Sequence, residues 1–309
     1  MRETRIYMNI KIKALIALSG TVLFFSLLVI IARAMVVDVS PMFLLFLRMS
    51  VAAIAFSPFL LKSGVWKKSK FKILVIVSLL STINLSFFIW GIQYTSASAS
   101  QLIYAAQPIL TILVSNYMLK EKYPTRSFVG VIVGLMGIIF IIYQSVAEKG
   151  ETISGSFIGN IAIVIAMLGW FWYIMLSKKL SKYFTPVEIG SVSIFVSLAV
   201  SIVLLIFQIV LTTVPVHLTK EALLAGIYMG FFGTFMTYIL MQYAIKYLTP
   251  LTVNLSSYIQ PVVVMVLAIF LLGEKLTVNF LIGSILVLSG VLLTASLEVY
   301  KRRRRWDPR

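Results

Sequence analysis

The sequence contains no cysteine and a single histidine, His217. Without cysteine the chain can form neither a disulfide framework nor a thiolate site, and a metal centre built from histidine and cysteine is excluded. Aspartate and glutamate are also scarce, ten against 27 lysines and arginines. We therefore expect no metal and no cofactor. A membrane-embedded enzyme is a distant alternative, because the apolar runs contain no nucleophile–base pair and no acidic pair.

Charged residues make up only 12% of the 309 residues, whereas 60% are hydrophobic. Soluble chains average about 25% charged residues and could not bury so much apolar surface. The apolar runs are continuous and about 20 residues long, which is the length of a helix that spans a bilayer. The sequence therefore predicts an all-α integral membrane protein.

Ten apolar runs follow one another with short links between them, and they predict ten transmembrane helices. The first run follows several basic residues and imitates a secretory signal peptide, but its length favours an uncleaved helix. The runs lie at about 14–32, 42–61, 71–92, 97–119, 127–145, 157–176, 187–211, 222–245, 251–272 and 278–297.

The chain contains an internal duplication. Residues 91–137 align with residues 244–290 without a gap, and the matches include polar, proline and glycine positions that shared hydrophobicity cannot explain. We expect a five-helix repeat at 1–147, a second at 153–298, and a basic tail at 299–309. Because five is odd, the second repeat is inverted in the membrane, a recurring plan of secondary transporters. Matched positions include Gln107-Pro108 with Gln260-Pro261, Glu121-Lys122 with Glu274-Lys275, and Gly137 with Gly290.

Most of the lysines and arginines fall on one face of this arrangement, including the run from Lys301 to Arg305 after the last helix. By the positive-inside rule that face is cytoplasmic, so both termini lie in the cytoplasm and the chain is a multi-pass protein of the cell membrane. The basic excess belongs to this topology, and no nucleic-acid partner is expected. The terminal basic run either sets the topology alone or also attracts anionic lipid.

These features resemble the EamA-type branch of the drug/metabolite transporter superfamily. The resemblance rests on the spans, the duplication, the repeated Gln-Pro and Glu-Lys pairs, and Arg48 before small residues in the second span. It implies a basket-like bundle in which helices one, three, four, six, eight and nine surround a central cavity, with helices five and ten at the periphery. It also implies transport of amino acids and other small metabolites. The first repeat departs from the family at Leu119-Lys120-Glu121, where Gly-Glu is usual.

Polar residues at helical spacing form matched stripes on the third, fourth, eighth and ninth spans. Polar groups in hydrocarbon need a partner or a hydrated cavity, so the stripes predict a substrate-binding cavity. For any single residue, packing between helices is the alternative. The candidates are Ser81, Asn84, Gln101, Tyr104, Thr234, Thr237, Asn254 and Ser257.

The sixth span adds Trp170 and Tyr173, which we interpret as an apolar wall for the substrate. Pro108 and Pro261 each remove a backbone N–H, so each marks either a bend or a carbonyl group turned to a cavity. Arg48 is the one charged residue clearly inside a span, and such a residue is a functional candidate that could bind a carboxylate. Since the second helix lies outside the implied cavity set, a structural or gating role is favoured.

The sequence therefore predicts a secondary transporter that moves small neutral or zwitterionic metabolites, amino acids first, by alternating access. Purines or other uncharged compounds are the alternative substrates, and a channel or a scaffold is the alternative class. The expected partners are a small-molecule substrate and the lipid bilayer. Gly130 and Gly134 form a GxxxG motif, which mediates either a homodimer or packing within the monomer.

The predicted orientation can be tested directly, because a chain without native cysteine accepts single-cysteine variants. A membrane-impermeant maleimide applied to intact cells is expected to label Lys149→Cys, in a link predicted to be external. The same reagent should label Ser69→Cys, in a predicted cytoplasmic link, only after the membrane is opened. Labelling in the reverse order would contradict the orientation.

Overall fold

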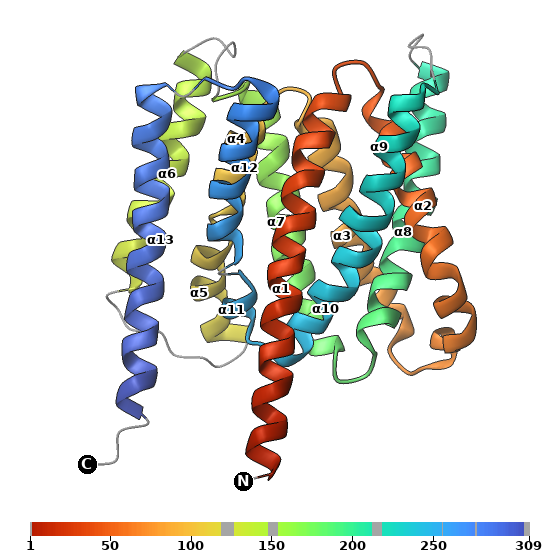
Figure 1. Ribbon diagram of the computed structural model, residues 1–309, viewed down its shortest axis with the longest axis horizontal. Coiled ribbons are helices and arrows are strands. Elements are labelled where there is room, and N and C mark those ends of the chain that lie inside the picture. The colour runs from red at the N-terminus through yellow and green to blue at the C-terminus, as the bar shows by residue number, and fades with distance from the viewer. Residues whose placement is uncertain are drawn as a thin grey trace.

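The protein is described here by a computed structural model, which describes residues 2–118, 127–147, 154–211, 218–254, 256–275 and 277–305. Within these residues the chain forms helices and turns, and no β-strand. Seven helical segments of the described chain are long and apolar enough to cross a membrane, and the helices lie side by side in one bundle (Figure 1). The prediction of an all-α, multi-pass membrane protein is therefore confirmed.

Five predicted spans are uninterrupted α-helices. The predicted eighth span, at 220–247 in the structure, contains one turn of π-helix, η2 (Phe231–Met236), between α9 (Lys220–Gly230) and α10 (Thr237–Tyr247). A short 3-10 helix, η1 (Val65–Lys67), follows the second span. The five uninterrupted helices are α1 (Arg2–Met35), α2 (Pro41–Ser63), α3 (Phe71–Gly91), α7 (Phe157–Leu180) and α8 (Pro186–Leu211).

The predicted fourth span is divided by a turn at residues 105–106, whereas the ninth is described as two helices on either side of residue 255, which lies outside the described residues. The fourth consists of α4 (Ala97–Tyr104) and α5 (Gln107–Met118), and the ninth of α11 (Pro250–Asn254) and α12 (Ser256–Leu272). In Figure 1, α4 and α12 lie together near the end away from the termini, whereas α5 and α11 lie toward the other end. The predicted fourth and ninth spans therefore run in opposite directions.

The predicted fifth and tenth spans correspond to α6 (Ser127–Ala147) and α13 (Val278–Arg305). Their described apolar stretches, Ile132–Ile141 and Val278–Gly290, are shorter than the other seven, so the count of ten spans stays a prediction. The two helices pack along each other at one edge of the bundle (Figure 1).

Side chains cap several helices at their first turn. The hydroxyl groups of Ser96, Ser156 and Thr219 accept the backbone N–H three residues later, at the starts of α4, α7 and α9. Such caps satisfy N–H groups that the first turn of a helix leaves without a partner. They explain why these helices begin at short polar links in an otherwise apolar sequence.

The two predicted proline sites differ in local structure. Pro108 is the second residue of α5, directly after the turn at residues 105–106, where its missing N–H costs no hydrogen bond. Pro261 lies inside α12, and the helix extends on both sides of it. The predicted interruption is therefore found directly at Pro108, whereas α12 continues through Pro261.

Helices from the two sequence halves are interleaved. Helix α1 packs against α10 and α12, α3 packs against α7 and α8, and α2 packs against α8 and α9. Each pair joins a helix from residues 1–147 to a helix from residues 153–298. The interior of the bundle is therefore built jointly by both halves.

Small residues bring α6 and α13 into close contact. A Cβ atom added at Gly290 would lie 2.3 Å from the Gly134 nitrogen and 2.6 Å from the Gly130 carbonyl oxygen. The GxxxG motif therefore packs against α13 of the same chain, as the second of the two sequence interpretations proposed. A homodimer would have to use another surface.

This contact predicts that Gly290→Ala lowers the melting temperature of the purified protein. The added methyl group meets backbone atoms that cannot turn aside, and overpacking of this kind costs about 1–3 kcal/mol. Thermal unfolding in detergent, followed by gel filtration, measures the effect. The matched control is Gly20→Ala, whose Cβ would meet only the end of the Leu240 side chain, at 3.2 Å. Equal melting temperatures for the two variants would contradict the contact.

Candidate functional site

A small cavity lies inside the bundle, where helices of both halves meet. Its volume is about 20 Å³, which is room for about one water molecule. It is bounded by α1, α4, α5, α7, α10, α11 and α12. The residues of this central cavity are Thr21, Phe25, Tyr104, Gln107, Trp170, Ile174, Met241, Val253, Asn254, Ser256 and Gln260.

Three of the predicted binding residues line this cavity, namely Tyr104, Trp170 and Asn254. The duplication contributes two more, since Gln107 and Gln260 belong to the repeated Gln-Pro pairs. Their amides bring matched polar groups from α5 and α12 to one place. The sequence analysis used this pair as a mark of the duplication and did not name it as a binding site, although the repeated amide was the signal.

Predicted amide side chains also connect helices. The Asn84 amide of α3 donates to the Tyr104 hydroxyl of α4 and, at 2.9 Å, to the Ala166 carbonyl of α7. The Asn254 amide donates to the Thr111 hydroxyl of α5 at 2.6 Å. These bonds hold Tyr104 and Asn254 in place at the cavity wall.

The predicted aromatic wall is part of a larger ring cluster. Trp170 lies against Tyr173, with ring centroids 5.3 Å apart, and against Tyr238 of α10, at 5.7 Å. The Tyr238 hydroxyl is 2.5 Å from the Ser81 hydroxyl, and Tyr173 is bonded to Ser193 of α8 at 2.9 Å. Of the cluster only Trp170 lines the central cavity. Tyr173 and Tyr238 pack against the Trp170 ring, and Ser81 is bonded to Tyr238.

Arg48 lies closer to the predicted site than the sequence suggested. Its side chain is fully buried, and its Nε donates to the Thr234 hydroxyl, at 2.7 Å, in the π-helical turn η2. Thr234 donates in turn to the Met229 carbonyl at 2.7 Å. The second helix thus contacts a member of the predicted polar stripe, although Arg48 itself is not among the residues that line the central cavity.

Three other predicted residues lie elsewhere or are not described. Gln101 is buried on α4 and its amide donates to the Ser100 hydroxyl at 3.3 Å; it is not among the residues that line the central cavity. Thr237 donates to the Phe232 carbonyl within its own span, at 2.9 Å. The side chain of Ser257 lies outside the described part of the structure.

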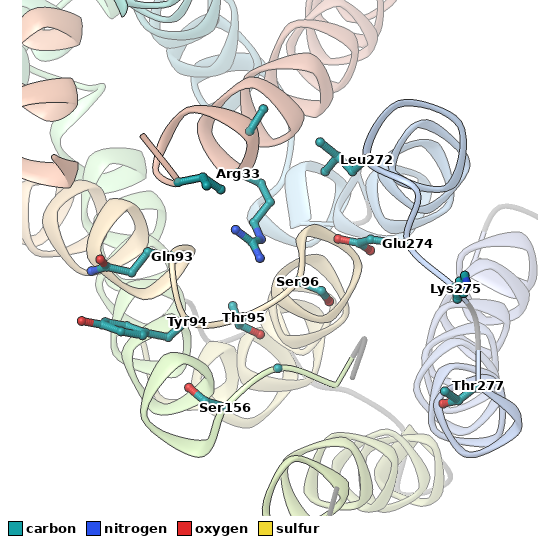
Figure 2. Close-up of a pocket in the computed structure, with 13 residues that line it drawn as sticks. Arg33, Gln93, Tyr94, Thr95, Ser96, Ser156, Leu272, Glu274, Lys275 and Thr277 are labelled. Atoms are coloured by element: carbon teal, nitrogen blue, oxygen red, sulfur yellow. The ribbon is translucent and has the colours of Figure 1, made fainter. Parts of the chain in front are cut away.

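A larger pocket opens at the end of the bundle opposite the two termini. Its volume is about 770 Å³, and it is bounded by the end of α1, the link between α3 and α4, the start of α7 and the link between α12 and α13. Figure 2 shows the Arg33 side chain pointing into this pocket from α1, opposite Thr95 and Ser96. The pocket is large enough for a small organic molecule.

Glu274 joins the two halves at the edge of this pocket. Its carboxylate accepts the backbone N–H of Ala97 at 2.8 Å and the Ser98 hydroxyl at 2.6 Å, at the first turn of α4. A carboxylate at the N-terminus of a helix satisfies open N–H groups and the helix dipole. Its counterpart in the first repeat, Glu121, lies outside the described residues.

The structure is a membrane-protein bundle of helices. Between the helices lies a small cavity lined by amide, hydroxyl and aromatic groups. The chain belongs to the EamA-like transporter family, whose model matches residues 12–143 and 157–296. It is therefore a membrane transporter, with a small-molecule substrate and a lipid surround, and the predicted family is confirmed.

Two relatives at 28% identity are named as transporters, and a third relative has a name that gives no function. An uncharacterised transporter of Clostridium kluyveri is 28% identical over 217 residues, which cover 70% of this chain and 68% of that protein. YyaM of Bacillus subtilis, also an uncharacterised transporter, is 28% identical over 218 residues, covering 69% and 68%. Protein PecM of Dickeya dadantii is 21% identical over 209 residues, covering 67% of each chain.

A solved crystal structure has the same overall fold. It superposes with a TM-score of 0.66 at 17% identity, over 92% of this chain and 98% of the other. At that identity the likeness concerns the fold alone.

The capping contact predicts that Glu274→Ala destabilises the protein. Loss of a side chain that caps a helix N-terminus costs about 1 kcal/mol, so the melting temperature of a chain of 309 residues should fall by about 2 °C. The control is Glu221→Ala, which removes an exposed carboxylate from the first turn of α9. An equal effect of the two substitutions, measured by thermal unfolding in detergent, would contradict the capping role.

Proposed function

We propose that this protein is a secondary transporter that moves small neutral or zwitterionic metabolites, amino acids first, by alternating access. The observation that carries the proposal is the central cavity, whose wall combines amide, hydroxyl and aromatic side chains from both halves of the chain. Such a lining suits a molecule with both polar and apolar parts. Among the described residues, the lining of the central cavity includes no lysine or arginine, whereas a phosphorylated substrate would need a cluster of them.

The proposed topology has ten spans in two inverted five-helix repeats, with both termini in the cytoplasm. The opposite directions of the fourth and ninth spans support the inversion. In this orientation the pocket of about 770 Å³ opens outward, and the central cavity of about 20 Å³ lies deeper in the bundle. A bound metabolite needs far more room than the central cavity offers, so transport requires the halves to move apart around it.

Each group of cavity residues takes a distinct role in this proposal. The amides of Gln107, Asn254 and Gln260 and the Tyr104 hydroxyl bind polar groups of the substrate, and the Trp170 ring covers its apolar part. Asn84, Ser81 and Thr234 act indirectly, through the hydrogen bonds that hold these side chains and their neighbours.

The basic tail and any assembly complete the proposal. Residues 299–309 lie at the cytoplasmic membrane surface, where basic side chains attract anionic lipid. A homodimer is compatible with the fold only through a surface other than the GxxxG motif, because α13 covers that motif in the monomer.

Counterflow in proteoliposomes tests the proposal. Vesicles are preloaded with an unlabelled amino-acid mixture and offered the same mixture in labelled form, and the initial rate of uptake is measured. We expect saturable exchange in the wild type and an about tenfold lower rate for Gln260→Ala, since one lost hydrogen bond to the substrate is worth roughly that factor.

The matched control is Gln101→Ala, which removes the same amide from a buried position on α4 outside the cavity lining. Exchange should survive there. Loss in Gln101→Ala with survival in Gln260→Ala would move the site to the polar stripe around Gln101. Exchange of purines instead of amino acids would change the substrate class, and no exchange of either by folded protein would contradict the carrier mechanism.

A further inference from the structure

Among the described residues, only one of the three nitrogens of the buried Arg48 guanidinium has a hydrogen-bond acceptor. Nε donates to Thr234, whereas Nη1 and Nη2 meet no hydrogen-bond acceptor in the described part of the chain. A guanidinium has five N–H donors, so four of them are unused. Burying such donors without a partner is costly, and native proteins seldom do so without a reason.

The positive charge of Arg48 is also uncompensated by any carboxylate whose side chain the structure describes. An isolated buried charge is far more expensive than a paired one. The described acidic side chains all lie elsewhere: Asp38 and Glu221 are exposed, Glu188 pairs with Lys68 at 2.6 Å, and Glu274 caps α4. A negative group from outside the chain would both neutralise the charge and occupy the free donors.

The surroundings connect Arg48 to the central cavity. Its guanidinium interacts electrostatically with the hydroxyl groups of Tyr104 and Tyr238. Tyr104 lines the cavity, and Tyr238 packs against Trp170, which lines it too. Arg48 itself is not among the residues that line the cavity, and the side chains that connect it to the cavity wall are Tyr104 and Tyr238.

The backbone places Arg48 of α2 close to α9 and η2. A Cβ atom added at Gly230 would lie only 2.8 Å from the Arg48 carbonyl oxygen, so a glycine is needed for α2 to approach α9 this closely. The next residues form the π-helical turn η2, which presents Thr234 to Nε. Single π-helical turns inside α-helices are frequent at functional sites.

We propose that Arg48 is the subsite for a carboxylate group of the transported substrate, reached from the central cavity when Tyr104 and Tyr238 move aside. This inference rests on the transport function proposed above. The two oxygens of a carboxylate accept Nη1 and Nη2 in the parallel geometry that arginine favours. The hydroxyl groups of Tyr104 and Tyr238, which interact electrostatically with the guanidinium, can supply further donors.

The proposal narrows the substrate class to zwitterions that carry one carboxylate. One guanidinium matches one carboxylate, as in an amino acid. Amino-acid amides and purines lack the group that would compensate the charge. A phosphate monoester carries close to two charges at neutral pH and would exceed what a single arginine balances.

Ligand-induced stabilisation of the purified full chain tests the subsite. The melting temperature is measured against increasing L-phenylalanine, 3-phenylpropanoate and L-phenylalaninamide, and against L-alanine, propanoate and L-alaninamide for a smaller substrate. In the wild type we expect the carboxylates of at least one series to raise Tm, with an apparent affinity about tenfold or more above that of the matching amide. Arg48→Met should remove this preference.

Two further measurements separate a binding role from a structural one. Without ligand, Arg48→Met should melt at the same temperature as the wild type or higher, because a buried, uncompensated charge is replaced by an apolar side chain of similar length. Arg48→Lys retains the charge but loses the paired donors, and should keep a carboxylate preference at about tenfold weaker affinity. Lys72→Gln, which removes an exposed charge from α3, is the control and should behave as the wild type.

Four results would overturn the proposal. Amides that stabilise the wild type as well as acids would show that no carboxylate site exists, and so would the absence of any shift with the four carboxylate compounds. A carboxylate preference that persists in Arg48→Met would place the site elsewhere. Saturable counterflow of purines in the same preparation would leave the transport function standing while the carboxylate subsite falls.

Discussion

Inside a bilayer no water is available to an unpaired polar group, and this constraint explains most of the contacts in the bundle. Helix ends are satisfied by side chains from other helices. Glu274 accepts two groups of the first turn of α4, and Lys178 donates to the carbonyl groups of Ile245, Lys246 and Leu248 at the end of α10, at 2.7, 2.9 and 2.8 Å. The first of these contacts also joins the two sequence halves.

The same constraint pairs the hydroxyl groups inside the bundle. The hydroxyl oxygens of Ser78 and Ser193 are 3.1 Å apart, and those of Thr82 and Ser197 are 2.8 Å apart. Two successive turns of α3 are therefore bonded to α8. Asn254, which is proposed to bind substrate, is also bonded to a neighbouring helix, and so is Asn84, which holds Tyr104 in place. Helix packing and cavity lining are therefore not exclusive roles. Arg48 departs from this pattern, and that departure is the reason to look for an external partner.

The sequence predicted the candidate site only in part. Helical spacing on single spans found Tyr104, Asn254 and Trp170, because these side chains point inward from spans that face the cavity. It could not show that Gln101 is not among the residues that line the cavity, or that Phe25 of α1 is, since both depend on how the helices are rotated against one another. Rotation is set by the sum of many weak contacts, among them glycine approaches such as that of Gly290 to α6.

The sequence by itself determined that the chain is an all-helical membrane protein and to which family it belongs, because a helix in lipid satisfies its own backbone and needs only a long apolar run. The duplication is likewise visible in the letters alone. Only the tertiary structure decided which polar side chains meet. It brought Arg48 of α2 to Thr234 of η2, 186 residues later, and left two of its nitrogens without an acceptor among the described residues. Contacts between distant segments depend on packing geometry in three dimensions, which no periodicity along one span contains.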